Sequence, residues 1–94
     1  MRGDIFGRYD RRRQRVRDAA RAVAARAGDV AAEQYLVEFY KTQAQATNPY
    51  NDWWAYADVR QKQADHENDL TIAQRRHADA VAKLNAQQLK LEKM

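Results

Sequence analysis

The chain has 94 residues and a net charge of +4, and eighteen of its apolar residues are alanine. A single small domain with so few large aliphatic side chains cannot build a thick globular core, although it can form narrow, closely packed helix seams. Cysteine and serine are both absent, which excludes disulfides, thiolate metal sites and the commonest hydrolase nucleophile.

A seven-residue apolar repeat predicts a first helix over about residues 8–47. The positions seven apart are Tyr9, Val16, Val23, Val30, Val37 and Ala44, and Ala19, Ala20, Ala27 and Tyr40 fill the intervening seam positions. This period is typical of a coiled-coil seam. The repeat passes Gly28 without a change of phase, which favours one continuous helix. The alternative is a helix that ends at Gly28 and restarts at Asp29.

The segment 47–52 predicts a turn, because it contains the only proline, Pro49. Proline disfavours helical geometry at the residue before it and lacks an amide hydrogen, so the first helix should end by about Thr47. Pro49 also suits the first position of a new helix that Asn48 caps, and Asn51 is the other candidate cap. So short a connection predicts that the two arms lie antiparallel.

The second arm, over about residues 50–93, contains no helix breaker. One seam position is expected at Tyr56, Gln63, Leu70, His77, Leu84 and Leu91, and the other at Val59, His66, Ala73, Ala80, Gln87 and Met94. At ~1.5 Å per residue the arms would be roughly 55 and 65 Å long. The stretch 60–69 has Ala64 as its only apolar residue, so the middle of the seam is polar. We therefore expect an all-α, coiled-coil-like helical hairpin that self-associates or docks on a larger body.

Charge is segregated along the chain, with a net of +6 in residues 1–27, −5 in residues 28–70 and +3 in residues 71–94. A hairpin would bring both basic segments to its open end. The candidate contacts for a phosphate or a protein partner are Arg8, Arg11, Arg12, Arg13, Arg15 and Arg17. These arginines are compatible with a solvated face, an acidic protein neighbour, nucleic acid or an anionic membrane.

Aromatic residues concentrate near the expected turn, where seven of the nine lie between residues 35 and 56. One interpretation is a small aromatic core that locks the turn. The other is a docking tip formed by Tyr50, Trp53 and Trp54, since exposed Trp and Tyr are favoured interface anchors. Both interpretations hold together if one tryptophan is buried and its neighbour is exposed.

His66 and His77 are eleven residues apart, too far for one helix to place both on one metal ion, and no Glu-x-x-His or His-x-x-x-His pair is present. Polar seam layers are the favoured interpretation of both histidines. The sequence therefore predicts no metal site, no cofactor and no catalytic residue, and the scattered carboxylates have no expected cleft that would raise a pKa.

These patterns predict a non-enzymatic structural or assembly protein, whose hairpin packs with itself or with other protein subunits in a large complex such as a phage particle or a secretion-type assembly. The alternatives are a nucleic-acid-binding or packaging accessory that uses the arginines, and a peripheral membrane element that uses the Trp-rich turn. The sequence has neither an apolar run long enough for a spanning helix nor a recognisable secretory signal, so a cytoplasmic or particle-bound location is expected.

Overall fold

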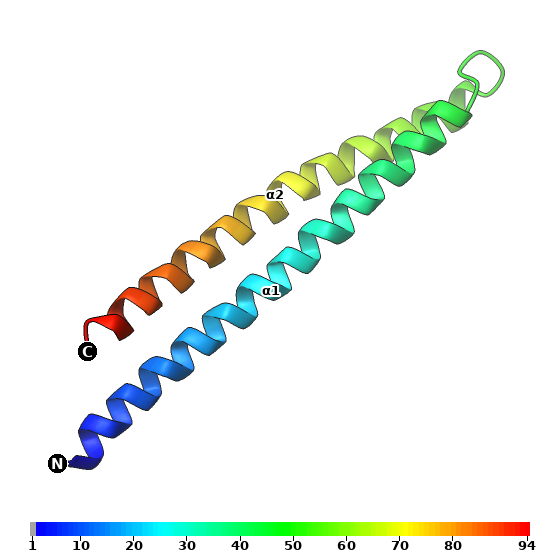
Figure 1. Cartoon of the computed structure of the whole chain (residues 1–94). Helices are drawn as coiled ribbons and strands as arrows, with labels where there is room; N and C mark the ends of the chain where they lie inside the picture. The colour runs from blue at the N-terminus through cyan, green and yellow to red at the C-terminus, as the bar shows by residue number, and fades with distance from the viewer. Residues whose placement is uncertain (1) are drawn as a thin grey trace.

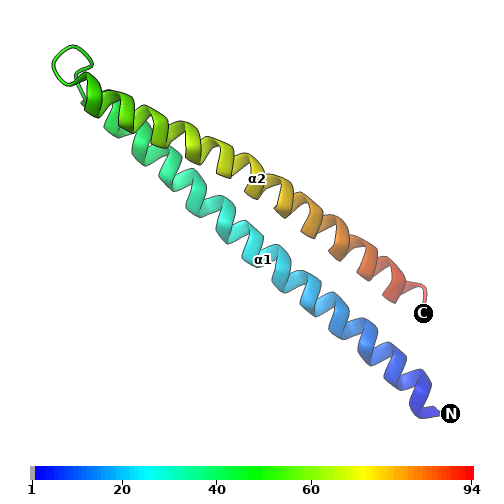
Figure 2. The same ribbon diagram turned by 180° about the vertical axis from the view of Figure 1, so that it is seen from behind.

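The computed structural model describes the backbone of residues 2–94 and the side chains of residues 7–94. It is an all-α hairpin in which α1 (Arg2–Ala46) and α2 (Trp53–Glu92) run antiparallel and pack along their length (Figures 1 and 2). Both ends of the chain lie at the end opposite the turn, and the Cα atoms span 77 × 14 × 13 Å. The predicted fold class is therefore confirmed, with a first helix that begins earlier than residue 8.

The residues of α1 that recur every seven positions face α2, as the valine repeat predicts. Val16, Val23, Val30 and Val37 are half-buried and Ala44 is buried, whereas Tyr9 is 45% exposed at the open end. Gly28 lies within unbroken helix, so the continuous-helix prediction is confirmed and the break is wrong. A Cβ added at Gly28 would have no neighbouring atom within 4 Å, so this glycine meets no packing requirement in the hairpin.

The second seam position of α1 differs from the prediction. Ala20 and Ala27 are exposed, and Leu36 is half-buried directly before Val37. The other half-buried residues between members of the repeat are Arg12, Ala19, Arg26, Glu33 and Tyr40. Each of these five residues comes three positions after a residue of the seven-residue repeat. Ala20 and Ala27 come four positions after such a residue, so they lie on the flank of the helix. The apolar stems of the two arginines pack along the seam while their charged ends reach water. The carboxylate of Glu33 instead contacts His66 of α2. Three of these five seam residues are therefore charged.

The seam of α2 follows the predicted register almost completely. Every predicted seam residue within the helix is half-buried or buried: Tyr56, Val59, Gln63, His66, Leu70, Ala73, His77, Ala80, Leu84, Gln87 and Leu91. Ala55, Ala57 and Val81, beside the seam, are also half-buried. Met94 is the exception, because it lies beyond the last helical residue and is exposed. Both histidines thus lie in the seam, as predicted.

The core of the hairpin is very thin. Within residues 7–94 the buried apolar residues are Ala44, Ala73 and Ala80, and Gln63 is the buried polar residue. Two helices can cover only one stripe of each other, so every layer stays open to water on two sides. Gln63 satisfies its amide within α2: its Nε2 donates to Glu67 Oε1 at 3.0 Å and its Oε1 accepts from Arg60 Nη1 at 3.1 Å.

The second half of the turn, which leads into α2, differs from the prediction. Asp52 caps α2, since its Oδ1 accepts from the amide of Ala55 at 3.2 Å. Asn48 instead closes the turn, with Oδ1 accepting from the amides of Tyr50 at 2.9 Å and Asn51 at 3.4 Å. The predictions that Asn48 or Asn51 caps the second helix are therefore wrong, and α2 begins at Trp53 instead of near residue 50. No residue of the described chain has a positive φ, so this turn needs no glycine.

Candidate functional site

The most exposed apolar group is the aromatic tip, which we define as Tyr50, Trp53 and Trp54. These side chains are 94%, 57% and 79% exposed. The two indole rings contact each other edge to face, with centroids 4.7 Å apart and an interplanar angle of 76°. The tip follows directly from the turn, because Asp52 starts α2 so that its first two residues face outward. Neither tryptophan is buried, so the condition under which both interpretations of the aromatic residues hold together is not met.

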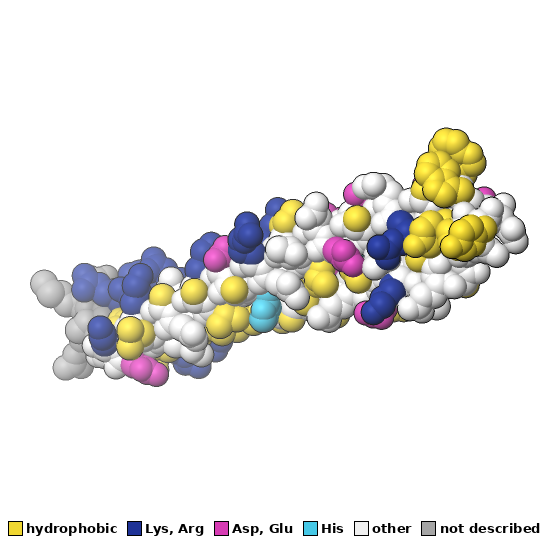
Figure 3. Space-filling view, turned by 90° about the horizontal axis from the view of Figure 1, so that it is seen from above, with side chains coloured by type: hydrophobic (Ala, Val, Ile, Leu, Met, Phe, Trp, Pro, Cys, Tyr) yellow, Lys and Arg dark blue, Asp and Glu magenta, His cyan; other side chains and the backbone are white. Residues whose placement is uncertain are grey.

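The aromatic residues of α1 divide between two faces near the turn. Tyr35 and Phe39 are exposed, with ring centroids 6.4 Å apart. Tyr40 turns into the seam, where its ring stacks on His66 at 5.3 Å and 6°. A compact aromatic core that locks the turn is therefore not formed, and most of the aromatic surface near the turn is in contact with water. Figure 3 shows large hydrophobic side chains projecting from one end of the rod.

The six candidate arginines lie at the opposite end and divide into two groups. We define the arginine face as Arg8, Arg11, Arg12 and Arg15, which line one shallow depression together with Met94 of the other arm. Of the remaining two, Arg13 lies over the ring of Tyr9, 5.8 Å from its centroid, and Arg17 is exposed. None of the six forms a salt bridge within residues 7–94. Lys and Arg side chains are dense at this end in Figure 3.

A third site, the cross-hairpin cluster, lies mid-seam and consists of Glu33, His66 and Asp69. Nδ1 of His66 lies 2.8 Å from Oε2 of Glu33 and 3.9 Å from Oδ2 of Asp69. The side chains of Glu33 and His66 are each 24% exposed, while Asp69 is more open. Sequence reasoning paired His66 only with neighbours on its own helix. Glu33 is 33 residues away, and only the register between the arms reveals the contact.

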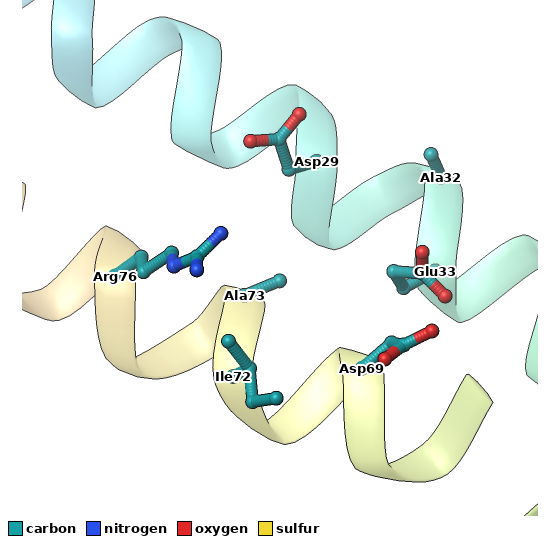
Figure 4. Close-up of a pocket in the computed structure, with 7 residues that line it drawn as sticks. All are labelled: Asp29, Ala32, Glu33, Asp69, Ile72, Ala73 and Arg76. Carbon is teal, nitrogen blue, oxygen red and sulfur yellow. The ribbon is translucent and has the colours of Figure 1, made fainter. Parts of the chain in front are cut away.

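The carboxylates of this cluster face a depression on the side of the hairpin. Its lining, drawn in Figure 4, is formed by Asp29, Ala32, Glu33, Asp69, Ile72, Ala73 and Arg76. The side chains of Glu33 and Asp69 approach each other from the two helices, and Arg76 reaches into the gap farther along (Figure 4). Asp29 is paired with Arg26 on its own helix, at 3.5 Å. The depression is therefore polar and carries both signs of charge.

One ion pair on α2 lies closer to the turn. Nζ of Lys62 lies 3.0 Å from Oδ2 of Asp58, one helical turn earlier. The hydrogen bond to Asp58, followed by the attraction between the two charges, raises the pKa of Lys62 above its ordinary value. Both side chains are at least half exposed, so this pair is a surface feature of one helix.

Comparison of the chain with protein-family models, curated proteins and solved structures gives no match. The case for a function therefore depends on the three surfaces described above. Neither helix of the described chain is both long and apolar enough to cross a membrane.

Proposed function

We propose that this hairpin is a non-enzymatic structural element that packs against further copies of itself or against other protein subunits in a larger complex, such as a phage particle or a secretion-type assembly. The observation that supports it is the imbalance between its core and its surface. Within residues 7–94 its buried apolar residues are three alanines. The large exposed apolar residues include Tyr35, Phe39, Tyr50, Trp53, Trp54, Ile72 and Leu89.

This imbalance favours association for a physical reason. Burying a Val, Leu, Ile, Phe or Met side chain contributes roughly 1.5–3 kcal/mol, and an alanine contributes much less. No large side chain within residues 7–94 is fully buried, so the hairpin leaves part of this stabilisation unused. A further helix packed on either side would cover the half-buried seam layers as well as the exposed groups.

The aromatic tip is the part of this surface best suited to a specific partner. Tryptophan and tyrosine are enriched among the interface residues whose loss weakens binding most. Their large rigid rings bury much area at little cost in side-chain entropy, and each carries one polar hydrogen for orientation. All three tip residues lie within five positions of one turn, so they would enter a partner's surface together.

The experiment is sedimentation of the intact chain over a hundredfold range of concentration. We expect a mass that rises above the 11.0 kDa of the monomer with increasing concentration. Replacement of both tryptophans, Trp53→Ala with Trp54→Ala, should weaken association at least tenfold. Leu89→Ala, which removes an exposed apolar side chain at the other end, is the matched control and should weaken it much less.

The outcomes separate the versions of the proposal. A monomer at every concentration would contradict self-association and leave docking on other subunits. Association that survives the tryptophan replacements but depends on Leu89 would move the interface from the tip to the arms.

A second candidate, a nucleic-acid-binding or packaging accessory, is favoured by the arginine face, where four guanidinium-bearing residues line one depression. Each phosphate neutralised by such a residue adds about −0.9 to the slope of log affinity against log salt for duplex DNA. Replacing Arg11, Arg12 and Arg13 with glutamine should therefore reduce the slope by roughly 2–3 while helicity is retained. Arg75→Gln is the control on the other arm. Binding that is insensitive to salt would contradict this candidate.

A further inference from the structure

The cross-hairpin cluster has the composition and the spacing of a metal-binding site. One potential ligand atom from each of Glu33, His66 and Asp69 lies within 4.8 Å of the other two. One imidazole nitrogen and two carboxylate oxygens form a donor set that suits Zn²⁺ and neighbouring divalent transition ions. Hydrogen bonding alone explains the contact between Glu33 and His66, but it does not use the nearby oxygen of Asp69.

Both helices contribute to the positions of these atoms. His66 and Asp69 are three residues apart on α2, so their side chains share one face. The Glu-x-x-His pairs that bind metals in helical bundles use the same spacing with the residue types in the opposite order. Glu33 reaches the pair from the second seam position of α1. The ring of His66 is held in place by its stack on Tyr40.

The distances agree with simultaneous binding. Zinc–ligand bonds of about 2.0–2.2 Å in a tetrahedral arrangement place neighbouring ligand atoms roughly 3.4 Å apart. The observed separations from Nδ1 of His66 are 2.8 and 3.9 Å, on either side of that value. Small side-chain rotations would therefore bring all three atoms onto one ion. The open side of the cluster, toward the depression in Figure 4, leaves room for water as a fourth ligand.

We propose that Glu33, His66 and Asp69 bind a divalent transition metal ion of the Zn²⁺ class, which links α1 to α2 in the middle of the hairpin. Arg76, which lines the same depression, is the charged group that competes with the ion for the carboxylates. Two of the three ligands, His66 and Asp69, belong to the stretch 60–69, where the seam has Gln63 and His66 in place of large apolar residues. The ion would thus strengthen the part of the seam with the least apolar packing. This proposal is independent of the proposed assembly function.

The experiment is titration of the intact chain with ZnCl₂ after removal of metals with a chelator, followed by calorimetry and by thermal unfolding monitored through helicity. We expect one ion per chain. At free Zn²⁺ tenfold above its dissociation constant, the ratio of folded to unfolded chain should rise about tenfold. For a chain of this size the melting temperature should then rise by roughly 6–10 °C.

The variants identify the ligands. His66→Gln and Glu33→Gln should each abolish the zinc-induced shift, and Asp69→Asn should reduce it at least threefold. His77→Gln is the matched control: it removes the other seam histidine and should leave the shift unchanged. If His66→Gln fails to fold, Glu33→Gln and Asp69→Asn provide the same comparison. The proposal would be overturned by no zinc-induced shift in the unmodified chain, by a shift that persists in Glu33→Gln and His66→Gln, or by one that His77→Gln removes.

Discussion

The two halves of the hairpin are held together by different kinds of contact. In the half near the turn, a hydrogen bond joins Glu33 to His66 and the ring of His66 stacks on Tyr40. In the half near the open end, no hydrogen bond or salt bridge joins residues 7–32 of α1 to α2. That half is packed through half-buried valines and leucines around Ala73 and Ala80.

The two kinds of contact contribute differently to the pairing of the helices: one fixes their register, and the other adds attraction without fixing it. Hydrogen bonds and ring stacks have a defined geometry, so contacts of this kind near the turn fix how α1 lies against α2. Small apolar side chains attract without direction and tolerate sliding, because the hydrophobic effect is roughly proportional to area. The half near the turn therefore specifies the pairing, and the half near the open end extends it.

The largest expected effect comes from disturbing the seam where packing is its only support. Ala80→Arg places a long charged side chain at a buried position of the open half. We expect the free energy of unfolding to fall by about 3 kcal/mol, through overpacking and the burial of charge. Ala78→Arg, two residues away on the exposed face, is the control and should change it little. Urea unfolding followed by helicity measures both variants. Equal losses of unfolding free energy in the two variants would show that Ala80 does not face α1.

An effect of intermediate size is expected at the turn. Asp52→Ala removes the side chain that accepts from the amide of Ala55 and should lower the free energy of unfolding by about 1 kcal/mol. Asn51→Ala is the matched control, since Asn51 contributes its backbone amide and not its side chain to the turn. If Asn51→Ala lowers the stability measured by thermal unfolding more than Asp52→Ala does, then Asn51 caps α2 and Asp52 does not.

The open half should also accept a stabilising change. Gly28→Ala adds a methyl group that meets no atom within 4 Å. Because glycine in a helix interior is less favourable than alanine by roughly 0.5–1 kcal/mol, the variant should be more stable by about that amount. Thermal unfolding of dilute protein tests the isolated hairpin. Loss of association in the same variant at high concentration would place the face around Gly28 in an interface.

The smallest effect is expected from the exposed pair on α2. Because the pKa of Lys62 is raised by Asp58, the stability this pair contributes is present below the ordinary pKa near 10.5 and is lost as pH rises through the folded value. Asp58→Asn should return the pKa of Lys62 toward its ordinary value in an NMR titration. Asp65→Asn, which removes a carboxylate bonded to Gln61, is the control and should leave it unchanged.

The fold follows from the sequence because two strong signals agree. The valines spaced by seven define one face of α1, and Pro49 ends that helix where the second arm can fold back. A seven-residue spacing on the second arm, counted from Tyr56 and from Val59, also predicted the seam of α2, including its polar layers at Gln63, His66 and His77. These features depend on local periodicity, which a single sequence carries in full.

The features that sequence reasoning missed depend on choices between near-equivalent groups or on contacts between the arms. Asn48, Asn51 and Asp52 are all suitable caps, and the selection depends on which amides the side chain of Asn48 already binds. Arg26 and Glu33 occupy seam positions that a search for apolar residues passes over. The cluster of Glu33, His66 and Asp69 requires the register between the arms, which the turn geometry sets.

The length of the rod has a consequence for its two chemically different ends. At physiological ionic strength, electrostatic interactions between exposed charges are screened over about 8 Å. The hairpin is 77 Å long, so the field of the arginine face does not reach the aromatic tip. The two ends are therefore electrostatically independent of each other. If both bind partners as proposed, a change of salt should alter binding at the arginine face while leaving the intrinsic affinity of the tip nearly constant.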